Sequence, residues 1–155
     1  MVIVFIIPYS FMISKSSKKC IVNRSNKTYP TKQGFRCHSG ISFQTAETIG
    51  LCMHVVRLPP GSVEKAHLHQ DHETAIYQIS GTSELRYGEQ LEEFEILRPG
   101  EFLYIPPNTP HLPRNSSETE ECVVVIARTD PNEQESVKLL PHLEKLVPEW
   151  TGKPE

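Results

Sequence analysis

Four histidines and one acid in this chain have the types and spacing of a metal site. Three of them, His67, His69 and His72, fall within six residues, and Glu73 follows directly. Residues i and i+2 of a β-strand point to the same face, so His67 and His69 would converge on one ion. His72 or Glu73 could add a third ligand after a short loop. His111 lies far along the chain, where a distant strand of a closed barrel could bring it to the same ion.

The residues around these histidines predict short strands. From residue 51 onward, β-rich runs are each followed by Gly, Pro or Asn turn signals, and the expected strands are 51–57, 74–80, 84–87, 91–97, 101–105 and 122–128. Strands at this spacing predict an all-β sandwich or barrel. Helical periodicity occurs only near residues 137–146, where Pro141 interrupts it.

Two motifs resemble those of the cupin superfamily. The first is written G-x5-H-x-H-x3,4-E-x6-G, and here Gly61 is followed at those spacings by His67, His69 and Glu73. The resemblance covers about residues 50–130, and it is similar to small single-domain microbial cupins. It implies a double-stranded β-helix, or jelly-roll, barrel.

The second cupin motif is written G-x5-P-x-G-x2-H-x3-N. Here Gly100 is followed at those spacings by Pro106, His111 and Asn115, and residues 82–99 separate the two motifs. Asn108 stands where this motif has its inner Gly. Asn tolerates the left-handed conformation that a Gly often supplies, so the change is mild.

The first motif departs from the family pattern by one residue. Seven residues separate Glu73 from Gly81, where the motif has six, so that counting back from Gly81 places Thr74 at the acid's position. A one-residue β-bulge near Glu73 would reconcile the two counts. Thr is a poor ligand for a divalent metal, so we expect Glu73 to be the ligand and His72 to be the alternative.

The resemblance implies one divalent metal bound by His67, His69, Glu73 and His111. Three imidazoles and a carboxylate suit Fe(II), Mn(II), Ni(II), Co(II) or Zn(II). Four protein ligands leave two octahedral positions open for a substrate, O2 or water.

The bulge also decides which side chains line the pocket, because barrel strands alternate between interior and exterior. With a bulge after Glu73, Gln78 points inward and could orient substrate. Without it, Tyr77 points inward. His54 and Tyr104 are further candidates for the pocket.

Three functions fit these residues. The first is a metal-dependent enzyme with dioxygenase-like chemistry on a small molecule. The second is a metal-dependent isomerase or epimerase of sugars or keto acids, for which Arg86 and Arg114 are the nearby basic residues, although both are expected to face solvent. The third is a non-catalytic barrel that binds or senses a small molecule. Cupins host many chemistries, so the sequence leaves open whether the protein is an enzyme.

The charge is distributed unevenly along the chain. Residues 1–46 hold seven basic residues and no acid, whereas residues 47–155 hold nine basic and nineteen acidic residues. We therefore expect a basic N-terminal extension outside the core (1–46), a cupin barrel (47–146) and a C-terminal tail (147–155), in which Trp150 could anchor on the barrel or on a neighbouring subunit. An acidic barrel disfavours nucleic acid as a partner.

The same segments bear on location and assembly. The longest apolar run, residues 2–7, is too short to span a bilayer, so no membrane contact is expected. We expect a cytoplasmic protein, with organellar import through the basic segment as the alternative. We also expect a homodimer, because small cupins expose sheet edges and apolar outer faces.

Overall fold

The computed structural model describes residues 19–132, 134 and 136–151. The apolar start of the expected extension, up to residue 18, and the end of the expected tail, residues 152–155, lie outside the described residues. In chain order the elements are β1 (Thr28–Pro30), β2 (Arg36–Ile41), α1 (Phe43–Ala46), β3 (Cys52–Leu58), β4 (His67–His69), β5 (Thr74–Ser80), β6 (Ser83–Tyr87), β7 (Glu93–Leu97), β8 (Phe102–Ile105), β9 (His111–Arg114), β10 (Cys122–Arg128), β11 (Val137–Leu139), α2 (Pro141–Glu144) and α3 (Pro148–Thr151).

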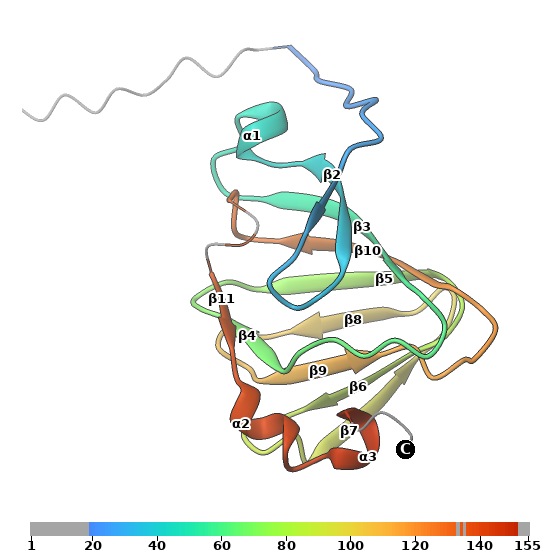
Figure 1. Ribbon diagram of the computed structural model, residues 1–155. Coiled ribbons are helices and arrows are strands. Elements are labelled where there is room, and N and C mark those ends of the chain that lie inside the picture. The colour runs from blue at the N-terminus through green and yellow to red at the C-terminus, as the bar shows by residue number, and fades with distance from the viewer. Residues whose placement is uncertain (1–18, 133, 135, 152–155) are drawn as a thin grey trace, which may run out of the picture.

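The strands form two antiparallel sheets, as the sequence predicts. The larger sheet has the order β1-β2-β3-β10-β5-β8, and the smaller has the order β11-β4-β9-β6-β7 (Figure 1). Neighbours in each sheet are mostly distant in sequence, which is the crossing pattern of a jelly roll. The expected all-β, double-stranded β-helix fold is confirmed.

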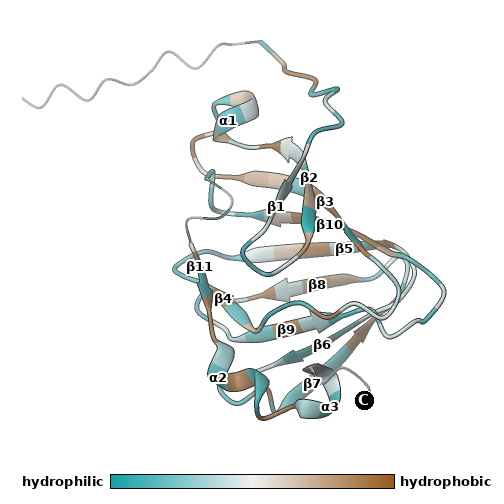
Figure 2. Ribbon diagram, viewed as in Figure 1, coloured by the Kyte–Doolittle hydropathy of each residue, from teal (hydrophilic) through white to brown (hydrophobic). Residues whose placement is uncertain are grey.

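Alternation of side chains directs one face of the larger sheet into the barrel. In β3, Cys52, His54, Val56 and Leu58 are buried, whereas Met53 is exposed. Figure 2 shows apolar residues recurring on β3, β10 and β5, the central strands of this sheet. Buried apolar side chains from β2, β3 and β10 pack in one core, whose members are Cys37, Val56, Leu58, Cys122 and Val124, and the partly buried Ile76 of β5 packs against it.

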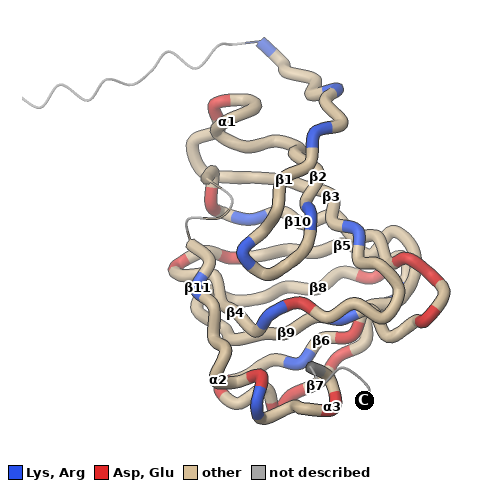
Figure 3. Tube along the Cα trace, in the orientation of Figure 1, with Lys and Arg blue, Asp and Glu red and all other residues tan. Residues whose placement is uncertain are grey.

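Part of the segment expected to lie outside the core belongs to the larger sheet. β1 pairs with β2, and β2 pairs with β3, with Cys37 opposite Val56. The barrel therefore begins well before residue 47. Figure 3 shows the basic residues of this segment running up to β2, whereas acidic residues begin at α1.

The C-terminal residues cover the outer face of the smaller sheet. Leu112 of β9 is fully buried. It packs in one cluster with Leu143 of α2, with Val147 just before α3 and with Trp150 of α3. The Arg114 guanidinium lies 4.0 Å from the centre of the Trp150 ring. The helical pattern near residues 137–146 thus resolves into β11 and a one-turn helix that begins at Pro141, because Pro suits the first helical turn and disrupts an interior. In the part of the chain that the structure describes, no helix has the length and apolarity needed to cross a membrane.

Substitution of Trp150 tests whether the C-terminal segment stabilises the folded domain. Trp150→Ala should lower the free energy of unfolding by about 3 kcal/mol, because a buried Trp is replaced by a cavity. Leu146→Ala is the matched control, since that side chain is 53% exposed and its loss should cost no more than about 0.5 kcal/mol. Urea unfolding followed by circular dichroism measures both. Equal stability of the two variants would mean that α3 does not stabilise the barrel.

Candidate metal centre

Strand pairing in the smaller sheet brings three histidines together. β4 lies between β11 and β9, and His67 sits directly opposite His111 in the antiparallel pair. His69 is two residues further along β4 and shares the inward face with His67. All three side chains are buried, so two strands far apart in the sequence present their imidazoles to one point inside the barrel.

The three imidazoles have the separation of a shared metal site. One nitrogen from each of His67, His69 and His111 lies within 4.8 Å of those of the other two. The ring centroids of His67 and His111 are 4.2 Å apart, and those of His67 and His69 are 5.2 Å apart. Three of the four predicted ligands are therefore brought together.

Backbone carbonyls fix the orientation of two of these rings. His67 Nδ1 lies 2.8 Å from the Lys65 carbonyl, and His111 Nδ1 lies 2.9 Å from the Thr109 carbonyl. A carbonyl only accepts, so each Nδ1 carries the proton and each Nε2 keeps a free lone pair. In the described part of the chain, the buried Nδ1 of His69 has no hydrogen-bond partner.

Burial keeps the imidazoles neutral, which is the form that binds metal. It lowers the pKa of His111 to about 4 and holds the pKa values of His67 and His69 well below the ordinary value. The positive charge of Arg128 acts in the same direction on all three.

The structure does not bring Glu73 to the histidines. Glu73 is exposed, and its Oε1 accepts a hydrogen bond from the Tyr104 hydroxyl at 2.8 Å. Thr74 is buried in its place and accepts a hydrogen bond from Arg128 Nε at 3.1 Å. Thr74 therefore takes the inward position at the start of β5, as counting back from Gly81 indicates.

The loop after His69 is held by Asn108. Asp71 has a φ of 60° and Asn108 a φ of 62°, the left-handed conformation expected for Asn108 in place of Gly. Asn108 Nδ2 donates to Asp71 Oδ1, and the backbone N–H of Asn108 donates to the His69 carbonyl at 2.9 Å. The bulge expected near Glu73 is absent: β5 pairs in step with β10 from Thr74 to Gln78, and the register shift lies between Val123 and Val124, which face Ser80 and Gln78.

The other predicted pocket residues lie away from the histidines. Gln78 is buried although no bulge lies near Glu73, and its side-chain amide donates to Cys122 Sγ and accepts from the Ser83 hydroxyl, so it stabilises the core. Tyr77 is exposed and does not line the cavity. Tyr104 is among the residues at the cavity, but its side chain is exposed and its hydroxyl donates to Glu73. His54 is buried, and its Nδ1 accepts from the Gly40 amide at 3.1 Å.

His72, the alternative ligand, is partly buried. It lies outside the only histidine cluster with metal-binding separation that the described residues contain.

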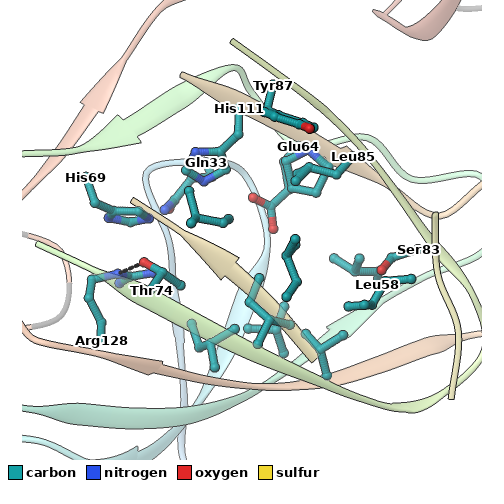
Figure 4. A pocket seen from close by; sticks show the side chains of 18 of the residues that line it. Gln33, Leu58, Glu64, His69, Thr74, Ser83, Leu85, Tyr87, His111 and Arg128 are labelled. Atoms are coloured by element: carbon teal, nitrogen blue, oxygen red, sulfur yellow. Dashed lines mark hydrogen bonds between the residues drawn. The ribbon is translucent and has the colours of Figure 1, made fainter. Parts of the chain in front are cut away.

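The histidines face a cavity of about 710 Å³ that both sheets line. Most of its lining is aliphatic or aromatic, and Figure 4 shows Glu64, Gln33 and Arg128 as polar residues among these side chains. Glu64 Oε2 lies 3.9 Å from His67 Nε2. Burial raises the pKa of Glu64 to about 8, against the opposing effect of Arg128.

The sequence did not predict Glu64, Gln33 or Arg128 as residues of the cavity. Arg128 could have been predicted, because alternation along β10 places it on the inward face with Val124 and Ile126. Gln33 lies in the β1–β2 connection, and Glu64 lies in the irregular segment before β4, where no periodicity indicates which way a side chain points.

Comparison with known proteins agrees with this geometry. A family profile described as Cupin domain matches residues 54–127. These residues form a cupin domain. The match includes both strands that carry the histidines and leaves out β1, β2 and the C-terminal helices.

Solved structures share the cupin fold at low sequence identity. The polyketide cyclase RemF from Streptomyces resistomycificus superposes with a TM-score of 0.67 at 19% identity, over 87% of this chain and 97% of that one. A Klebsiella pneumoniae protein with a double-stranded β-helix domain gives 0.54 at 20% identity, over 76% and 89%.

Oxalate decarboxylase from Bacillus subtilis gives a TM-score of 0.63 at 17% identity over 82% of this chain. The cupin spans only 34% of the oxalate decarboxylase chain. A search of curated proteins found no match. At these identities the likeness establishes the fold.

The residues of the cupin fit a divalent metal. Two imidazoles have oriented Nε2 lone pairs, and the third has a buried nitrogen with no hydrogen-bond partner among the described residues. Such a set, with no thiolate among the three clustered residues, suits the first-row divalent metals named above.

Metal binding should depend on His69. The purified protein should bind about one divalent ion per chain, and His69→Ala should abolish binding because two imidazoles remain. His142→Ala is the control, since that histidine is exposed and lies outside the histidine cluster. Metal analysis after reconstitution with Mn(II) or Co(II) measures all three proteins. A wild-type protein that retained no metal would contradict the site.

Proposed function

We propose that this cupin is a metal-dependent enzyme that acts on a small molecule, with oxygenase-type chemistry. The observation that carries the proposal is the meeting of three neutral imidazoles at the wall of a large internal cavity. A cavity of about 710 Å³ falls in the range of small-molecule sites. A structural metal site would instead be closed by protein ligands.

The side chains of the cavity suit a substrate with an apolar body. Phe35, Leu58, Leu85 and Ile105 line it together with the histidines. Such walls exclude water, and they strengthen electrostatic interactions with the few polar groups present. A bound Fe, Mn, Ni, Co or Zn ion would supply Lewis acidity and open coordination positions beside these walls.

Oxygen uptake tests the oxygenase chemistry. The Fe(II)-loaded protein should consume O2 with at least one member of a panel of enediols, thiols and flavonoid-like phenols. His142→Ala should match the wild type, and His69→Ala should show only the background rate. Absence of uptake with every member would contradict the oxygenase proposal while leaving metal binding intact.

A metal-dependent isomerase or epimerase is the second candidate, because the cavity contains the polar groups that such chemistry needs. Glu64 and Arg128 line it, and Arg128 is buried. Arg86 and Arg114 do not contribute, since both guanidinium groups stack on Trp150 outside the cavity. Turnover of a sugar or keto acid without O2 would favour this candidate. A third candidate, binding or sensing without turnover, would give ligand affinity and no product.

We further propose that the protein forms a homodimer. β8 is the edge strand of the larger sheet, and its outer face carries exposed Phe102 and Tyr104. The Phe102 ring lies 4.7 Å from that of Tyr77 on β5, which is also exposed. An aromatic patch beside a free edge is a surface that a second copy can cover.

Sedimentation at micromolar concentration tests the dimer. The wild type should sediment as a dimer, and Phe102→Lys should shift it toward monomer by placing a charge in the apolar patch. Phe43→Lys, at an exposed position on α1 beside the other half of the sheet, should not. A monomeric wild type would contradict the proposal.

A further inference from the structure

Glu64 is an acid in an unusual place for a soluble protein. It lies in the segment between β3 and β4, three residues before His67, and its side chain is only 14% exposed. Figure 4 shows its carboxylate directed into the cavity that His69 and His111 also face. Its carboxylate therefore lies beside His67, 3.9 Å from Nε2, at one side of the cluster that His67, His69 and His111 form.

The backbone holds Glu64 rigidly in this position. Its amide donates to the Pro113 carbonyl of β9 at 3.0 Å, and the next amide, of Lys65, donates to the Gln33 carbonyl at 2.9 Å. Val63 forms a β-bridge with Arg114. The segment is thus attached to the strand that begins at His111, so Glu64 and the histidines share one framework.

The surroundings balance the charge of this carboxylate only in part, because the effect of burial outweighs the favourable charge of Arg128. Among the described residues, its one ion-pair contact within 4 Å is with His67, a ring that the site keeps neutral. Its neighbours on the cavity wall include Leu58 and Leu85. A buried acid next to neutral imidazoles is costly unless a cation offsets it.

We infer that Glu64 is the carboxylate ligand that completes the metal site with His67, His69 and His111. The inference rests on the metal in the proposed function, and it assigns to Glu64 the role that the sequence resemblance gives to Glu73. Glu64 approaches the cluster from the segment before β4, whereas Glu73 comes after it, on the exposed side, where Tyr104 donates to it.

Two isosteric variants test whether Glu64 or Glu73 contributes to metal binding. Glu64→Gln removes the charge without changing the volume, and it should weaken Co(II) or Mn(II) binding by at least about tenfold, as loss of a group supporting a metal does. Glu73→Gln is the matched control and should stay within about twofold of the wild type, since its side chain is in solvent. Titration calorimetry gives the affinities, and the Co(II) absorption spectrum should change for Glu64→Gln alone.

A second variant and a folding measurement keep the test decisive. Glu64→Asp retains the charge but withdraws it by one methylene, so it should also weaken binding and alter the Co(II) spectrum. The metal-free melting temperature of Glu64→Gln should equal or exceed that of the wild type, because the variant removes a buried acid whose charge Arg128 offsets only in part. The rise in melting temperature on adding metal should be smaller than for the wild type.

The outcomes distinguish this inference from the proposed function. Metal binding by the wild type that is lost in His69→Ala but unchanged in both Glu64 variants would overturn the role of Glu64 and leave the metal site standing. Loss of binding in Glu73→Gln with retention in Glu64→Gln would overturn it in favour of Glu73. A wild type that binds no metal would overturn both.

Discussion

The register between β4 and β9 is the constraint on which the site depends. His67 faces His111 across an antiparallel pair, and alternation along β4 then places His69 on the same side. A shift of one residue would turn the β4 histidines to the outer face, where Leu68 now packs against the buried C-terminal cluster. The histidine cluster and the outer core are therefore two consequences of one register.

Hydrogen bonds at the two ends of β4 hold that register. Before it, the Glu64 amide donates to the Pro113 carbonyl, and after it, the Asn108 amide donates to the His69 carbonyl. The first contact ties the segment before β4 to β9, and the second ties the end of β4 to the segment before β9. Asn115 stabilises the far end of β9, since its buried amide donates to the carbonyls of Leu58 and Glu120. The second motif thus supplies one ligand and two residues that position it.

The fold and most of the histidine cluster could be predicted because they follow from local periodicity. The spacing of His67 and His69 decides their common face, and turn residues delimit most of the strands. The basic N-terminal segment was harder, because its charge and polar composition indicate an extension, while Cys37 and Tyr29 pack in the core that faces β3. β1 and β2 join the larger sheet only because β2 pairs with β3, which lies further along the chain.

The position of the carboxylate could not be predicted from local periodicity. The motif count offered Glu73 or Thr74, and both counts assume that the ligand follows the histidines on a regular strand. β5 starts in step with β10 at Thr74, with no bulge near Glu73, and Thr74 is the buried residue. Thr74 then accepts from Arg128, so an acid is missing from that wall while a buried cation remains beside it. Glu64 restores a carboxylate to the cavity from an irregular segment, and only the tertiary contacts of that segment with β9 could reveal it.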